Sequence, residues 1–375
     1  MTKLFNDIKT NVSQDSLKKY IRLGFLVIVA GILGNVLFTL ITTDRSVLDS
    51  LVAFKLRYIL LAMGMALIPW LTNTLRVLIW TRFLGHRFSF FQILRIVIST
   101  DLGSAVSPTA IGGGYVKAGM LMQNGMSPGA SASLMTLGSV EDGIFFLFAV
   151  PASIYISSCW DLPIIRTLIH TVKSYLLPAS VILVALVLFF FLFRQLKKYR
   201  PAEKPFFTHK LFEKFQSHVL QAIRDFTRVY KLIGTNGKKQ FAATMFLTSI
   251  QWLTRYSILA VLLLAFDIRI DPVLFFLFQW LTFSMMTLIP TPGATAGAEA
   301  SFLLIYSSLI PGNVIGFMTA AWRFLTFYFH IILGSVIIGL FMLVDMRTSR
   351  KKKRSPGLDF PSRRNYAVQV NKINK

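Results

Sequence analysis

The chain contains two apolar stretches, each interrupted by a short segment rich in proline and glycine: Ser107-Pro108-Thr109-Ala110-Ile111-Gly112-Gly113-Gly114 and Thr291-Pro292-Gly293-Ala294-Thr295-Ala296-Gly297-Ala298-Glu299. Aligning Pro108 with Pro292 places Gly113 on Gly297, and the same register brings Trp70-Leu71-Thr72 close to Trp252-Leu253-Thr254. Bare backbone at membrane depth is tolerated only inside protein or beside a wet cavity. Helices interrupted at corresponding points of two repeats are therefore typical of membrane transport sites.

Composition indicates the fold class. The chain is 54% hydrophobic and 15% charged over 375 residues, whereas soluble domains are about 25% charged. Several apolar runs reach the roughly 20 residues that cross a bilayer as a helix. The sequence therefore predicts an all-α membrane protein. The single cysteine, Cys159, excludes an internal disulfide framework and a cysteine metal cluster.

Six full transmembrane helices are expected, at 21–42, 58–84, 127–157, 172–193, 240–266 and 313–345. The net charge of +24 comes largely from clusters of Lys and Arg that flank these spans. Positive residues favour the cytoplasmic side and anionic headgroups. We therefore expect a cytoplasmic N-terminus (1–20), linker (194–239) and tail (346–375), with an anionic lipid surface as partner and no nucleic acid.

The same charge rule favours two re-entrant helical hairpins, at 90–125 and 272–310, because a complete crossing at 90–107 would place the basic linker outside. The hairpins would enter from opposite sides, so the halves 21–193 and 240–345 would form an inverted repeat. The linker contains an amphipathic segment, His209 to Gly234. It is expected to lie on the membrane surface, with a regulatory or partner-binding role as the alternative.

Seven ionisable residues fall within the apolar segments, where each costs about 2.5–3.5 kcal/mol unless it faces a cavity or another charge: Arg76, Lys117, Glu141, Asp142, Arg255, Glu299 and Arg323. Asp101 and His330 are near candidates. One interpretation is structural: Glu141 or Asp142 pairs with an arginine, Glu299 pairs with Arg323, and Arg76 reaches the headgroups by snorkelling. The other is functional: the seven residues bind substrate, and the excess of cations leaves a basic cavity for an anion.

The loops support the functional interpretation in two ways. Lys117 and Glu299 follow the Gly-rich breaks, so they would lie in the first turns of half-helices, whose free N–H groups suit phosphate. The small residues leave backbone uncovered and predict a groove open to the membrane. The alternative is that the glycines only permit tight helix packing. The loop positions concerned are Pro108, Gly112, Gly113, Gly114, Pro292, Gly293 and Gly297.

Catalytic chemistry finds little support in the sequence. The five histidines show no metal spacing, and no nucleophile elbow or phosphate-binding lysine loop occurs. We therefore expect no catalytic residue, no metal and no cofactor. A membrane-embedded transferase that uses Asp142 or Glu141 as a base stays open as an alternative.

At these residues the chain resembles the flippase-like family of the lysylphosphatidylglycerol synthase transmembrane region. The matching pattern is a Pro/Gly-rich loop leading to Lys117, the pair Glu141-Asp142, a second loop ending at Glu299, and Arg323 in the final helix. The second loop departs from the Pro-Gly-Gly-x-Gly of several relatives. In the synthases this region flips an aminoacylated phospholipid that a separate soluble domain makes, and only 30 residues follow Asp345 here.

The resemblance implies translocation without synthesis. The expected function is flippase-like transport of a phosphate-bearing headgroup, on a phospholipid, an aminoacyl-phospholipid or a polyprenyl-linked lipid, across the inner membrane of a bacterial or archaeal cell. The alternatives are the transferase and a non-transporting partner of such an enzyme. A homo-oligomer or a lipid-synthesising enzyme is an expected partner.

Overall fold

The computed structural model describes residues 56–107, 112–167, 210–287 and 297–354, with Ala294 and scattered positions between 169 and 188. For 210–220 and 345–354 it describes the backbone only. Several predicted features lie outside the described residues: segment 1–20, the span 21–42, most of the span 172–193, the tail beyond 354, and the loop residues Pro108, Pro292 and Gly293.

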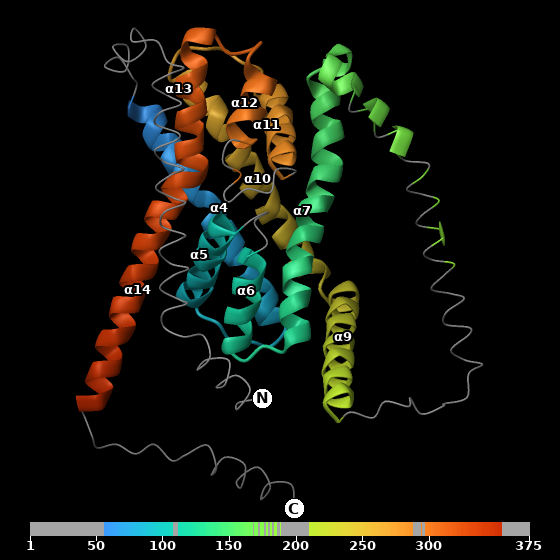
Figure 1. Ribbon diagram of the computed structural model, residues 1–375, viewed down its shortest axis with the longest axis vertical. Coiled ribbons are helices and arrows are strands. Elements are labelled where there is room, and N and C mark those ends of the chain that lie inside the picture. The colour runs from blue at the N-terminus through green and yellow to red at the C-terminus, as the bar shows by residue number, and fades with distance from the viewer. Residues whose placement is uncertain are drawn as a thin grey trace, which may run out of the picture. The chain divides into compact units, whose positions relative to one another are not determined.

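Within the described ranges the chain is helical apart from short turns, as Figure 1 shows. Four segments are long and apolar enough to cross a membrane: Leu56–Phe83, Pro128–Ile156, Lys238–Leu264 and Gly312–Val344. Each begins and ends within two residues of a span predicted from the sequence. The all-α membrane class is therefore confirmed, because apolar runs of this length leave no other way to satisfy the backbone in lipid.

The first three of these spans are single helices, α4 (Leu56–Phe83), α7 (Pro128–Ile156) and α10 (Lys238–Leu264). The fourth is divided into α13 (Gly312–Arg323), a π-helical turn η5 (Phe324–Tyr328) and α14 (Phe329–Arg354). A π turn places one extra residue in a helix, and such turns are frequent at functional sites. This interruption was not predicted.

The chain divides into two units, Met1–Ile331 and Ile332–Lys375. The first unit contains every residue of the site described below. The second unit continues α14, and its described part keeps large apolar side chains exposed, among them Val336, Leu340 and Val344.

Helices α4 and α10 pack along each other at the centre of the first unit (Figure 1). They carry the two Trp-Leu-Thr sequences that the alignment of the repeats brought together. Small and β-branched residues such as Ala62, Ala66 and Thr74 on α4 are fully buried, which permits the close approach. Helix α7 contacts α10 as well, so residues of α4, α7 and α10 can meet.

Two pairs of shorter helices lie where the hairpins were predicted. Helix α5 (Phe90–Val106) packs against α6 (Gly112–Gln123), and α11 (Pro272–Thr287) contacts α12 (Gly297–Tyr306). At about 1.5 Å per residue, none of the four reaches the roughly 30 Å of a bilayer core. A capping box of Ser89 and Gln92 fixes the start of α5.

Gly112 and Gly113 of α6 serve tight packing against α5, which corrects part of the groove hypothesis. A Cβ atom at Gly113 would lie 2.5 Å from the Thr100 carbonyl oxygen of α5 and would collide with the Ser104 side chain. At Gly112 a Cβ would lie 2.8 Å from the Gly103 carbonyl oxygen. Because backbone atoms cannot move aside, a leucine at Gly113 would separate α5 from α6 instead of filling a groove.

Helix α9 (Lys210–Asn236) corresponds to the predicted amphipathic segment. Part of its apolar face packs against α7, where Val229 and Ile233 are buried. The Thr136 hydroxyl hydrogen bonds with that of Tyr230 at 2.9 Å. The apolar face of α9, which was expected to lie on the membrane surface, thus packs in part against α7.

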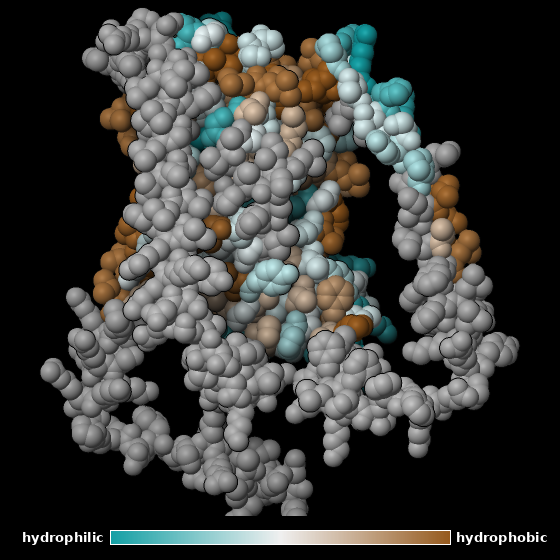
Figure 2. All heavy atoms as spheres, viewed as in Figure 1, coloured by the Kyte–Doolittle hydropathy of each residue, from teal (hydrophilic) through white to brown (hydrophobic). Residues whose placement is uncertain are grey.

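Large apolar side chains also remain exposed on the first unit, for example Leu147 and Phe148 of α7, which are 68% and 69% exposed. Figure 2 shows hydrophobic residues at several places on the visible described surface, among more polar ones. Such a surface is costly in water and is suited to lipid acyl chains.

Candidate functional site

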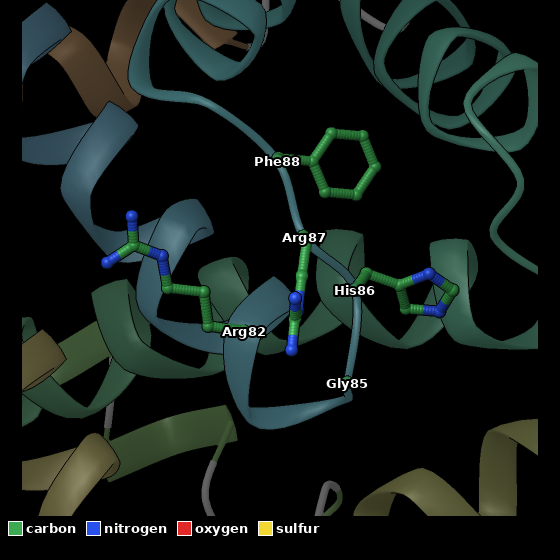
Figure 3. Close-up of a pocket in the computed structure, with 5 residues that line it drawn as sticks. All are labelled: Arg82, Gly85, His86, Arg87 and Phe88. Atoms are coloured by element: carbon green, nitrogen blue, oxygen red, sulfur yellow. The ribbon is translucent and has the colours of Figure 1, made fainter.

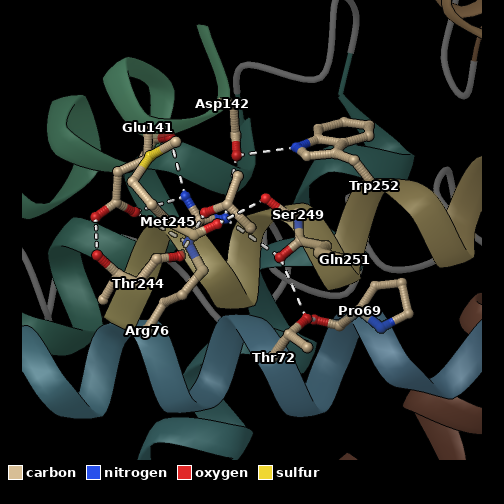
Figure 4. A network of polar contacts seen from close by, with 12 residues as sticks. Pro69, Thr72, Arg76, Glu141, Asp142, Thr244, Met245, Ser249, Gln251 and Trp252 are labelled. Atoms are coloured by element: carbon tan, nitrogen blue, oxygen red, sulfur yellow. Dashed lines mark hydrogen bonds and ion pairs between the residues drawn. The ribbon is translucent and has the colours of Figure 1, made fainter. Parts of the chain in front are cut away.

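The centre of the site is an ion pair between Arg76 of α4 and Glu141 of α7. The Nε and Nη2 atoms of Arg76 donate to Glu141 Oε2 at 3.0 and 2.8 Å. The other oxygen, Oε1, accepts from Trp80 Nε1 at 2.8 Å and from Thr244 Oγ1 of α10 at 2.5 Å. Glu141 of α7 therefore connects α4 and α10, and it is only 1% exposed (Figure 4).

Arg76 does not snorkel, which corrects the prediction from the sequence. It is 4% exposed, because its guanidinium turns inward to the carboxylates. Its Nη1 atom donates to Gln251 Oε1 at 3.2 Å, and Nη2 donates to the Gly138 carbonyl at 3.1 Å. Gln251 Oε1 also accepts from Thr72 at 3.4 Å. The network thus ties α4 to α10 next to the two Trp-Leu-Thr sequences.

Asp142 differs from its neighbour Glu141. Its carboxylate lies 3.1 Å from Arg76 Nη1 and accepts from Trp252 Nε1 at 3.0 Å. Its side chain is 29% exposed, whereas that of Glu141 is 1% exposed. Adjacent residues on a helix point about 100° apart. Asp142 is therefore the member of the acidic pair that is accessible to another molecule.

Lys117 of α6 is half-buried and interacts electrostatically with Arg76, Asp142, Glu141 and Asp101. No described carboxylate lies within ion-pair distance of its ammonium. Asp101 of α5 is engaged instead by Trp70 Nε1, which donates to Oδ2 at 2.6 Å. The structure thus brings Lys117 and the near candidate Asp101 to the Arg76 network.

Arg255 of α10 is half-buried and lies within a candidate membrane span. Its guanidinium carbon lies 5.7 Å from the centre of the Trp252 ring and 5.2 Å from that of Phe283. Among the described residues it has these aromatic contacts and no carboxylate within ion-pair distance. Cation–π contacts stabilise a guanidinium while leaving its N–H groups available.

Glu299 and Arg323 form the second ion pair suggested by the sequence. Arg323 Nε donates to Glu299 Oε1 at 3.2 Å, and the two side chains are 2% and 12% exposed. The guanidinium carbon also lies 4.6 Å from the centre of the Phe327 ring in η5. Nearby, Gln279 donates to Tyr306 at 2.9 Å and accepts from Trp322 at 3.0 Å. These bonds tie α11, α12 and α13 together.

The sequence predicted an excess of cations over carboxylates among the charged residues of the apolar segments, and the structure does not show that excess. With Asp101 added to the seven charged residues selected from the sequence, four carboxylates stand against four cations: Asp101, Glu141, Asp142 and Glu299 against Arg76, Lys117, Arg255 and Arg323. The charges are unevenly paired, however. Arg76 and Arg323 have carboxylate partners, whereas Lys117 and Arg255 have none within the part of the chain that the structure describes. Of the described residues, no group of three His, Cys, Asp or Glu could hold a metal ion.

Sequence reasoning missed several members of this network. Thr244, Thr248 and Gln251 of α10 are all buried and lie on the same face as Arg255. Their spacing of three and four residues within an apolar span is a polar stripe that the sequence could have revealed. The substrate-binding role of the seven charged residues stays a prediction.

A pocket of about 590 Å³ lies apart from this network, at the turn between α4 and α5. It is lined by Arg82, Gly85, His86, Arg87 and Phe88 (Figure 3). Gly85 has a positive φ of 82°, which turns the chain there. Three basic side chains with no acidic one favour an anion at this surface.

The fold and the site together define a multi-pass helical membrane protein with a buried charge network between its central helices. The chain matches the family described as the lysylphosphatidylglycerol synthase TM region over residues 23–334, and it belongs to that family. It is also similar to a UPF0104 membrane protein of Archaeoglobus fulgidus. The two are 25% identical over 281 residues, which cover 72% of this chain and 82% of the relative.

Proposed function

We propose that this protein is a flippase-like transporter that moves a phosphate-bearing lipid headgroup across the cell (inner) membrane of a bacterium or archaeon. The observation that carries the proposal is Arg255, a cation inside a candidate span that contacts two aromatic rings and, of the described residues, no carboxylate. An arginine at membrane depth costs about 2.5–3.5 kcal/mol on insertion scales. A binding function accounts for this cost, since no ion pair among the described residues offsets it.

Phosphate is the group that best suits the available cations. The planar guanidinium of Arg255 can bind two phosphate oxygens at once. Lys117 provides a second cation; it is the sixth residue of α6 and not in the first turn as expected, so its ammonium, and not the helix N-terminus, would contact the anion. Asp142 can accept a hydrogen bond from a hydroxyl or amine elsewhere on the headgroup.

The remaining charges have a supporting role in this proposal. Arg76 with Glu141, and Arg323 with Glu299, hold the helices in place from buried positions. Such fixed pairs keep Asp142 and Arg255 in a defined geometry. A headgroup would therefore bind between α6, α7 and α10, while its acyl chains remain in the membrane.

The architecture we infer has six full spans and two opposed re-entrant hairpins in an inverted repeat, with both termini cytoplasmic. The short lengths of α5, α6, α11 and α12 and the packing within each pair support the hairpins. The contact between α4 and α10 supports the repeat, because these two helices carry the Trp-Leu-Thr sequences that correspond between the halves. Alternating movement of the halves would move the headgroup.

Reconstitution into liposomes tests this function. Vesicles would carry fluorescent analogues of phosphatidylglycerol, a polyprenyl phosphate and ceramide, which lacks phosphate, and a membrane-impermeant quencher would report exposure of each dye. We expect the protein to accelerate translocation of at least one phosphate-bearing lipid and not of ceramide. Mass spectrometry of the same vesicles distinguishes the transferase, which would change the lipid chemically. Neither movement nor conversion would contradict the proposal and favour an accessory role.

A further inference from the structure

The pocket at the turn between α4 and α5 has the size and the charge of a ligand site (Figure 3). Its volume of about 590 Å³ falls within the roughly 300–1,000 Å³ that is usual for bound ligands. Its lining includes Arg82, His86 and Arg87 and no acidic residue. Both arginines are exposed, and within the described part of the chain neither has a carboxylate within ion-pair distance. The pocket therefore offers cationic groups to an anion.

The backbone of this turn is held in a fixed geometry. Basic residues at the end of a span can simply favour the cytoplasmic side or the C-terminus of a helix. Here, however, the His86 N–H donates to the Thr81 carbonyl at 2.9 Å, and the Gly85 N–H donates to that of Arg82 at 3.0 Å. These bonds close α4 with a glycine of positive φ, and Phe88 anchors the turn from a buried position. A fixed backbone lowers the ordering cost of binding.

The surroundings of the pocket favour a lipid as the source of the anion. Arg82 lies in the last turn of α4, so the pocket is at the end of a candidate membrane span. Phe91, the second residue of α5, is 64% exposed and offers apolar surface beside the turn. A guanidinium can bind two oxygens of a phosphate group at once. The pocket and Phe91 thus suit the two parts of one molecule, a phosphate-bearing headgroup and an acyl chain.

Trp80 connects this end of α4 to the network around Glu141. It is 3% exposed, and its Nε1 atom donates to Glu141 Oε1 at 2.8 Å. Its ring also lies against the junction of α9 and α10, because a Cβ atom at Gly237 would lie 3.2 Å from Trp80 Cζ3. The exposed Lys238 and Lys239 follow at the start of α10. Positive charge therefore gathers on the chain segments that adjoin Trp80.

We propose that the pocket is a loading site, at which the phosphate of a lipid headgroup binds at the membrane surface before it reaches the central network. Arg82 follows Arg76 by six residues, which is about 9 Å along the axis of α4. A headgroup would therefore pass from one cationic site to the next over a short distance, with no covalent change. The loading role rests on the proposed function, whereas the anion site itself does not.

Calorimetry in neutral detergent tests the anion site. The protein carries Arg255→Gln throughout, so that the proposed central site does not contribute, and it is titrated with short-chain phosphatidylglycerol or with inorganic phosphate. Changing Arg82 and Arg87 together to glutamine should weaken binding of the lipid by about tenfold, because charge-assisted hydrogen bonds to the phosphate are lost. The matched control changes Arg57 and Arg269, two exposed arginines, to glutamine and lowers the net charge equally.

Each result of this titration decides the anion site. Weaker lipid binding by the pocket variant, with wild-type affinity in the control, is the expected result. Equal affinities in the two variants would overturn the site, because only the overall charge would then matter. Binding of inorganic phosphate without any binding of the lipid would overturn the lipid as the ligand and leave a site for a free anion.

Translocation tests the loading role. The rate is measured in liposomes with increasing fractions of phosphatidylglycerol that is fluorescent on its acyl chain, with Arg255 kept. The pocket variant should need a severalfold larger lipid fraction to reach half of its maximal rate, and it should keep that maximum because the central site is intact. A concentration dependence equal to that of the control variant would overturn the loading role. If the wild-type protein moves no lipid, the loading role falls with the proposed function, whereas the calorimetry still decides the anion site.

Discussion

Replacing Arg76 with methionine should strongly destabilise the protein. Its guanidinium makes five polar contacts, with Glu141 twice and with Gly138, Gln251 and Asp142 once each. Methionine preserves much of the apolar volume and removes every one of these contacts. Glu141 would then be a carboxylate 1% exposed with only the Trp80 and Thr244 donors.

The expected cost is about 3–5 kcal/mol, the range for removing one partner of a buried ion pair. It arises mainly from the carboxylate left without a counter-charge. A second change, Glu141→Gln, removes that charge at nearly constant volume and keeps an oxygen for Trp80 and Thr244. The double variant should therefore recover part of the stability that Arg76→Met loses.

The single cysteine provides the assay. Cys159, in the turn η3 (Cys159–Asp161) that follows α7, is 6% exposed. A thiol-reactive dye added during heating in detergent should react as the chain unfolds. We expect an unfolding midpoint several degrees lower for Arg76→Met than for Arg269→Met, a change at an exposed arginine. Equal midpoints for these two variants, or a double variant less stable than the single one, would refute the reasoning.

Three further predictions follow from particular contacts. Gly113→Ala should cost about 1–3 kcal/mol through overpacking against α5. Gly119→Ala, where a Cβ meets nothing within 4 Å, should be neutral or stabilising; equal effects in the same thermal assay would contradict the packing account. Burial raises the pKa of the Cys159 thiol, so at pH 8 native protein should react with maleimide more slowly than unfolded protein, and equal rates would show an accessible thiol. Changing Arg82 and Arg87 to glutamine should weaken the binding of inorganic phosphate or of anionic vesicles at the pocket between α4 and α5, as measured by calorimetry and flotation; unchanged binding of both would exclude an anion site there.

Much of the fold follows from the sequence because the bilayer imposes a length on apolar helices. The spans at 58–84, 127–157, 240–266 and 313–345 were found within two residues for this reason. The outer bounds of the two helix pairs were also close to the predicted ranges 90–125 and 272–310, since Pro and Gly mark where helices end. The π turn was not predictable, because an extra residue in a helix depends on what packs around it.

The pairing of charges was only partly predictable. The partners Glu299 and Arg323 followed from the cost of buried charge. The separate environments of Glu141 and Asp142 did not, because both residues have the same chemistry and only their directions on α7 differ. The depth of Arg76 and the role of Asp101 likewise depend on how α4 meets α5, α7 and α10.

The central claim is that Arg255 binds the headgroup of a lipid in transit. The most direct measurement compares translocation of fluorescent phosphatidylglycerol in liposomes that contain equal amounts of wild-type, Arg255→Gln or Arg269→Gln protein. Arg269 is the matched control, because it is exposed beyond the end of α10. The account predicts that Arg269→Gln moves lipid at the wild-type rate. The translocation rate of Arg255→Gln should be at least tenfold lower, which corresponds to about 1.4 kcal/mol of headgroup binding. Wild-type translocation by a folded Arg255→Gln protein would contradict it.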